Sequence, residues 1–167
     1  MRATNRFLRC ITEYIILFFV YGGIYFLIEC IWKREISDIR MFMLGGGISV
    51  FLGLLNNIFD YDTDFLLQCF MGMMIVVLAE SILGYRWNVV EGLGIWDYND
   101  LRFSGVDGQV NLYFALAWFF LSGILIILDD AINYYILGFK PDTPPYYCAL
   151  GHLLFKMKPK KCRKGSY

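Results

Sequence analysis

The stretch YIILFFVYGGIYFLIECIW, from Tyr14 to Trp32, decides the fold class of this chain. Its 19 residues contain a single charged side chain, that of Glu29. A helix needs about 20 predominantly apolar residues to cross the hydrocarbon layer of a bilayer. Similar stretches follow at about Met41–Phe59, Phe65–Gly84 and Val110–Leu128. The sequence therefore predicts an all-α fold, a polytopic membrane helical bundle of about four transmembrane helices.

The composition of the whole chain agrees with a membrane as its solvent. Of its 167 residues, 58% are apolar and 18% are charged, and the mean hydropathy is +0.52. A soluble domain of this size does not carry so few charges. The formal net charge of zero gives no basis for binding nucleic acid. The long N-terminal apolar run lacks a cleavage pattern, so we interpret it as the first membrane helix.

The candidate metal ligands and redox groups are scattered. The five cysteines form no Cys-x-x-Cys pair, and His152 is the only histidine of the sequence. A structural zinc site needs several such ligands close together. We therefore expect no metal, no cofactor and no disulfide framework.

The basic residues favour one orientation. With four spans, the face that holds both termini carries ten Lys and Arg residues, and the opposite face carries five. Basic residues are enriched in cytoplasmic loops. The prediction is a multi-pass protein of the cell (inner) membrane with both termini in the cytoplasm.

The segment after the fourth span differs in composition from the rest. Pro141, Pro144 and Pro145 interrupt helical structure, and a lysine-rich tail ends the chain. Between them, Tyr146–Met157 has apolar residues at helical spacing. We therefore divide the chain into a four-helix transmembrane domain, residues 1–139, and an interfacial helix with a basic cytoplasmic tail, residues 140–167. Such a tail binds anionic membrane lipid.

Two ionisable residues lie inside the apolar stretches and need a reason to be there. Glu29 is near the end of the first span and shares a helical face with Tyr21 and Tyr25, whereas Glu80 is near the end of the third span. Because these two spans run in the same direction, both glutamates must reach the same membrane face.

The longest loop, from Tyr85 to Gln109, connects the third and fourth spans at that same face. It contains the sequence WDYN at 96–99 between glycines at 92, 94, 105 and 108, which is typical of a folded loop. One hypothesis is a substrate or partner site at the non-cytoplasmic face, with Arg86 or Arg102 as the counter-charge. Its residues are Glu29, Glu80, Arg86, Trp96, Asp97, Tyr98, Asn99 and Asn111. The alternative is structural: the carboxylates reach the interface or cap helices and fix the loop to the bundle.

Part of this region resembles a known family. The segments AESILG (79–84), WDYN (96–99) and GQVNLYFALAW (108–118) are similar to those of the CmpB-type bacterial membrane proteins, a family of ABC-transporter permeases. Glu80, Gly84, Trp96, Asp97, Tyr98 and Gly108 match the family pattern, and Glu29 resembles its first-helix glutamate. Asn99 stands where the family has Ser, and SDIRMFMLGGG (37–47) departs from its Asn-Arg-Gly and Tyr-Gly-Pro pattern. The resemblance implies a membrane component, and any ATP-driven role needs a separate ATP-binding subunit.

Several functions remain open. The chain has no nucleotide-binding G-x-x-x-x-G-K-[ST] motif, and His152 falls on the opposite side from the carboxylates, so we expect no enzyme. The favoured function is a permease-like transporter component. The alternatives are a small structural or regulatory membrane protein that binds a partner through the WDYN loop, and a holin-like pore. Association with another membrane protein or with a second copy of the chain stays open.

Overall fold

The computed structural model describes residues 2–137 and 143–160, and the side chains from Ile11 onward. Its helices are α1 (Arg2–Lys33), α2 (Ile39–Ile58), α3 (Phe65–Ala79) and α4 (Leu112–Ala131). Two π-helical segments, η1 (Glu80–Val90) and η2 (Ile132–Leu137), continue α3 and α4. This confirms the predicted all-α bundle. Within the described residues, four spans are long and apolar enough to cross a membrane: Ile11–Lys33, Ile39–Ile58, Phe65–Val90 and Leu112–Leu137.

Short polar side chains set the first residues of three helices. The carboxylate of Asp38 accepts from the backbone N–H of Arg40 at 2.8 Å, at the start of α2. Asp64 does the same for α3 and Asn111 for α4, where its side chain accepts from Tyr113 N at 2.9 Å. Such caps satisfy N–H groups that have no partner within the helix.

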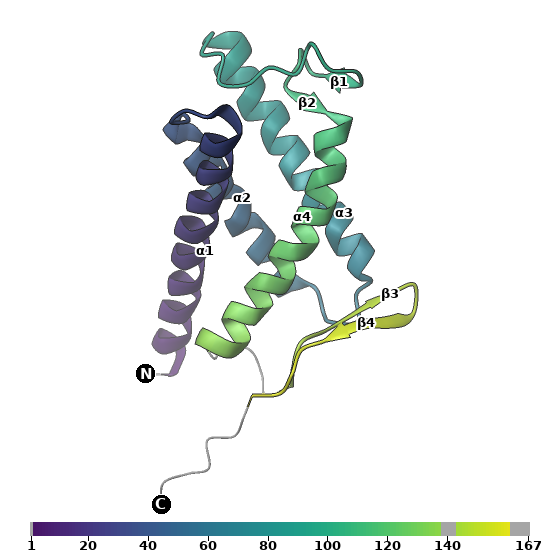
Figure 1. Cartoon of the computed structure of the whole chain (residues 1–167). Helices are drawn as coiled ribbons and strands as arrows, with labels where there is room; N and C mark the ends of the chain where they lie inside the picture. Colours follow the sequence, from purple (N-terminus) through teal and green to yellow (C-terminus); the bar gives the residue numbers. More distant parts are fainter. Residues whose placement is uncertain (1, 138–142, 161–167) are drawn as a thin grey trace, which may run out of the picture.

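The helices run alternately up and down, which gives the bundle two different ends (Figure 1). One end, here called the loop end, holds η1 and the loop of residues 91–111. That loop includes the short paired strands β1 (Ser104–Gly105) and β2 (Val110–Asn111). The other end, here called the hairpin end, holds the first turns of α1 and the strands β3 (Tyr146–Ala149) and β4 (His152–Lys156). Every site described below belongs to one of these two ends.

Small residues let α1 and α2 approach each other closely. A Cβ atom on Gly22 would lie 2.7 Å from the carbonyl oxygen of Phe42, and one on Gly45 would lie 2.5 Å from the Cβ of Tyr25. Gly53 has a similarly close neighbour in Leu17. The stripe Gly45, Ser49 and Gly53 therefore packs within this bundle, as small residues do between membrane helices.

The helix predicted over Tyr146–Met157 is wrong, because this segment is a β-hairpin. Strands β3 and β4 are antiparallel, and Ala149 is opposite His152. Leu150 and Gly151 form the two-residue turn with φ of 50° and 79°, the positive values that tight hairpin turns require. Along β3, Tyr147 and Ala149 are buried and alternate with less buried neighbours, which is the period of a strand.

Replacing Asp64 with alanine should loosen the hairpin as well as α3. The Asp64 carboxylate accepts from Leu150 N in the hairpin turn at 2.6 Å and from Leu66 N at 2.9 Å. These backbone bonds, the one from Leu150 first, lower the pKa of Asp64 below its ordinary value. We expect Asp64→Ala to lower the melting temperature and to speed hydrogen exchange in residues 146–156.

The same carboxylate gives this stabilisation a defined pH dependence. Because the pKa of Asp64 is lower in the folded state, its contribution is complete well above the ordinary value of 3.8. It is lost as the pH falls through the lower folded value. The difference in melting temperature between the wild type and Asp64→Ala should therefore be constant above pH 5 and shrink in more acidic buffer. A difference that grew on acidification would contradict this assignment.

Candidate functional site

The loop of residues 91–111 is folded onto the bundle by its own polar groups. Trp96 is 8% exposed, and its indole N–H donates to the carbonyl oxygen of Gln109 at 3.1 Å. Ile95 N donates to the side-chain oxygen of Asn88 in η1 at 2.6 Å. Gly84 lies beneath this contact, because a Cβ there would be 2.7 Å from the Trp96 ring. The loop is thus a fixed wall next to η1.

A cavity of about 380 Å³ lies between this loop and the helices α1, α2 and α4. This is within the volume range of small-molecule sites. Five of the predicted site residues line it: Glu29, Glu80, Trp96, Asp97 and Tyr98. Its other aromatic side chains come from α1 and α4: Tyr21, Tyr25, Trp32, Phe114 and Trp118. Glu29 and Glu80 therefore lie at the same end of the bundle, as the directions of the first and third spans predicted.

Glu80 is the most buried charged group of this cavity. It is 3% exposed, and its carboxylate accepts a hydrogen bond from the indole N–H of Trp118 at 3.1 Å. Tyr25 stacks on Trp118 with ring centroids 5.4 Å apart, so the donor is held in place from α1. Within residues 11–137 and 143–160, no Lys or Arg side chain lies within 4.0 Å of this carboxylate. Glu80 therefore faces the cavity with one neutral donor.

Glu29, in contrast, has a basic partner. The ammonium of Lys33, one helical turn further along α1, lies 3.0 Å from Glu29 Oε2. The same ammonium donates to the carbonyl oxygen of Ile95 at 3.0 Å and to Ser37 Oγ at 3.3 Å. Lys33 thus neutralises Glu29 and joins α1 to the loop. The site hypothesis did not include Lys33, although its i, i+4 spacing from Glu29 is the signal that identifies it.

Three of the predicted site residues have structural roles outside the cavity. Arg86 pairs with Glu91, with Nε 2.9 Å from Oε1, so it is not the counter-charge of the buried glutamates. Asn111 caps α4 and donates to the Arg102 carbonyl oxygen at 2.9 Å. The Asn99 N–H donates to Asp97 Oδ1 at 2.8 Å within the loop. The contacts of these three residues therefore fit the structural alternative given above, in which polar groups cap helices and hold the loop on the bundle.

Tyr98 lies at the junction of the loop and the cavity. Its ring stacks on Phe114 of α4, with centroids 4.6 Å apart. Burial, followed by the nearby carboxylates of Glu80 and Glu29, raises the pKa of its hydroxyl above the ordinary value. The hydroxyl is consequently a neutral hydrogen-bond donor at any physiological pH.

A second group of buried polar side chains, at the hairpin end, was missed from the sequence. Its members are linked by hydrogen bonds and lie at most 6% exposed: Glu13, Asn56, Asp129, Asp130 and Asn133. The Tyr147 hydroxyl of the hairpin donates to Asp130 Oδ2 at 2.7 Å. Burial first, and then Asp130, raises the pKa of Tyr147. We call this group the inner polar cluster.

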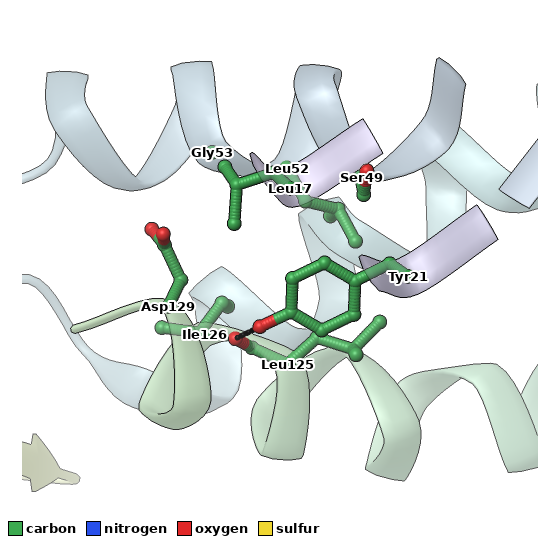
Figure 2. Close-up of a pocket in the computed structure, with 8 residues that line it drawn as sticks. All are labelled: Leu17, Tyr21, Ser49, Leu52, Gly53, Leu125, Ile126 and Asp129. Atoms are coloured by element: carbon green, nitrogen blue, oxygen red, sulfur yellow. Dashed lines mark hydrogen bonds between the residues drawn. The ribbon is translucent and has the colours of Figure 1, made fainter. Parts of the chain in front are cut away.

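A small void adjoins both the cavity and the inner polar cluster. The void has a volume of about 10 Å³. Its lining residues, drawn in Figure 2, are Leu17, Tyr21, Ser49, Leu52, Gly53, Leu125, Ile126 and Asp129. The Tyr21 hydroxyl donates to the Leu125 carbonyl oxygen at a long 3.5 Å, and the Asp129 side chain extends from α4 toward α2. A void of this size has room for about one water molecule. Tyr21, Ser49 and Leu125 line both this void and the cavity, and Asp129 of the inner polar cluster also lines the void.

Comparisons with family models, with curated proteins and with solved structures found no match. The resemblance to the CmpB-type permeases therefore stays a prediction. What the structure supports directly is an integral membrane bundle with four candidate spans and a lined cavity at one end.

Proposed function

We propose that the protein is a permease-like component of a membrane transport system, and that the cavity at the loop end is where a small molecule is admitted. The observation that carries this proposal is the cavity itself. It is about 380 Å³ in volume, and charged, hydroxyl and aromatic groups from α1, η1, the loop and α4 converge on it. Apolar walls with a few placed polar groups are the usual composition of a ligand site.

The position of the WDYN segment favours this function over partner docking. Trp96 is buried against η1 and Tyr98 stacks on α4, so the two large aromatic residues of the segment face the cavity side. A docking loop would instead present its aromatic anchors at the surface. A holin-like pore is not expected to have a folded loop. The hydrogen-bonded loop at this end therefore disfavours that alternative as well.

The proposal extends to the assembly. A chain without a nucleotide-binding motif needs an ATP-binding subunit for ATP-driven transport. We further propose the bacterial cell membrane as its location, with the hairpin end and both termini in the cytoplasm, so that the cavity is on the outer face. Co-purification of an ATP-binding protein with the tagged chain is the expected result.

Filling the cavity should abolish small-molecule retention. Ala117 and its neighbour Leu116 in α4 are both exposed on the bundle surface, but only Ala117 lines the cavity. Proteoliposomes are incubated with a metabolite extract, washed, and analysed by mass spectrometry. We expect at least one compound to be enriched over empty liposomes, and its retention to fall about tenfold or more in Ala117→Trp because a large ring occupies the space.

Leu116→Trp is the matched control, since it adds a large ring at the lipid-facing surface. It should retain the compound as the wild type does. Retention that is equal in both variants, or release of a trapped dye such as calcein by the unmodified protein, would contradict an access site in the cavity.

A further inference from the structure

The charges that line the cavity do not balance. Its charged residues are Glu29, Lys33, Glu80 and Asp97, and Lys33 is committed to Glu29. Asp97 and the buried Glu80 are therefore left as an acidic surplus. Burying an uncompensated carboxylate in an apolar environment costs free energy, and a bound cation offsets that cost.

The aromatic side chains that line the cavity indicate which kind of cation would bind there. Tyr25 and Trp118 form a stacked pair beside Glu80, and Trp96 and Tyr98 close the loop side. Aromatic faces attract organic ammonium groups and pack against their apolar substituents. A metal ion instead needs several converging oxygen or nitrogen ligands. Among the described residues, no group of three or more His, Cys, Asp or Glu side chains is arranged to hold one.

The cavity also borders the lipid. Ile24 and Ile28 of α1 and Leu121 of α4 line the cavity and are exposed on the bundle surface. α1 packs mainly on α2 and α4 mainly on α3, so the cavity lies between two helix pairs. In a bundle that spans the membrane, this side of the cavity, between α1 and α4, faces the lipid.

We propose that the cavity binds an organic ammonium ion with an apolar body, whose charge pairs with the Glu80 carboxylate and whose body packs on the rings of Tyr25, Trp96 and Trp118. This inference rests on the proposed function, because it takes the cavity to be the ligand site. It adds the chemical class of the ligand and the residue that recognises its charge.

Equilibrium binding in nanodiscs of phosphatidylcholine, which carry no net charge, tests this inference. The probe is tritiated benzyltriethylammonium, and the competitors are its neutral carbon analogue, (2,2-diethylbutyl)benzene, and the anion benzenesulfonate. We expect the cation to bind at least about tenfold more tightly than either competitor, because only the cation gains both the carboxylate and the ring faces. Absence of saturable cation binding, or equal affinity for the three compounds, would overturn the inference.

Glu80→Gln removes the charge with little change in shape, and should weaken binding of the cation at least about tenfold while leaving the neutral analogue unchanged. Glu91→Gln is the matched control, because Glu91 pairs with Arg86 and does not line the cavity. It should bind the cation as the wild type does. If Glu80→Gln does not fold, the inference is tested in two other ways. Glu80→Asp keeps the charge and should still bind the cation more tightly than the neutral analogue, and the wild type should rank the three compounds as stated above.

The two proposals fail in different ways. If metabolite retention depends on Ala117 but the cation has no advantage over its neutral analogue, the cavity is a ligand site and only the ammonium inference is wrong. If neither retention nor probe binding responds to Ala117→Trp, the proposed function is wrong, and the inference that rests on it falls too.

Discussion

Replacing Asn56 with alanine should lower the free energy of unfolding by about 3 kcal/mol, because it leaves two buried carboxylates short of a shared donor. Asn56 is 6% exposed in α2. Its side-chain amide donates to Asp129 Oδ2 at 2.8 Å and to Asp130 Oδ1 at 3.1 Å in α4. No water replaces this donor cheaply, since Asp130 is 0% exposed. Chemical unfolding in detergent micelles measures the loss.

The neighbouring residue provides a matched control. Asn57 is exposed, and its amide donates at 3.2 Å both to Glu13 Oε1 and to the Tyr14 hydroxyl. Water can replace an exposed donor, so Asn57→Ala should cost less than about 1 kcal/mol. Equal losses in Asn56→Ala and Asn57→Ala would show that burial of the cluster does not decide the stability of the hairpin end.

The inner polar cluster is a feature that could not be predicted from the sequence, because most of its hydrogen bonds join different helices. The fourth apolar stretch was predicted to end at about Leu128, just before Asp129 and Asp130, and no partner was predicted for either carboxylate. Several hydrogen bonds of the cluster join residues far apart in the sequence: Asn56 is 73 residues from Asp129, and Asn133 is 120 residues from Glu13. Periodicity along one helix gives the face on which a residue lies, but not which residue of another helix is opposite it.

Other features of the fold could be predicted because they depend on local chemistry. The length and composition of the apolar stretches predicted four spans, and alternation of direction predicted that Glu29 and Glu80 emerge at the same end. The hairpin was missed because Tyr147, Leu150, Leu154 and Met157 also fit helical spacing. The turn at Leu150 places a non-glycine residue at positive φ, which no short sequence pattern indicates. Lys33 was omitted although its spacing from Glu29 indicates the ion pair; only its contact with the loop carbonyl of Ile95 could not be predicted from the sequence.

The loop over the cavity depends on one glycine, and Gly108→Ala should cause the largest loss of order there. Gly108 is buried and has a φ of +77°, and its carbonyl oxygen accepts from Tyr98 N at 2.8 Å. A Cβ atom would collide with Asp97 Oδ1 and would lie 2.6 Å from Asn99 Nδ2. The alanine therefore adds a steric conflict to the backbone strain. Hydrogen exchange of residues 95–111 and the free energy of unfolding in micelles measure the effect.

Gly92 separates the two causes, because it shares the backbone conformation but not the crowding. Its φ is +67°, and a Cβ there would have nothing within 4 Å. Gly92→Ala should cost only the left-handed strain of about 1 kcal/mol, whereas Gly108→Ala should cost at least about twice as much. Because Asp97 and Tyr98 line the cavity, only Gly108→Ala should also weaken probe binding. If both alanines cost the same and leave binding intact, the WDYN segment does not depend on the space at Gly108, and the loop is not the fixed wall that the cavity requires.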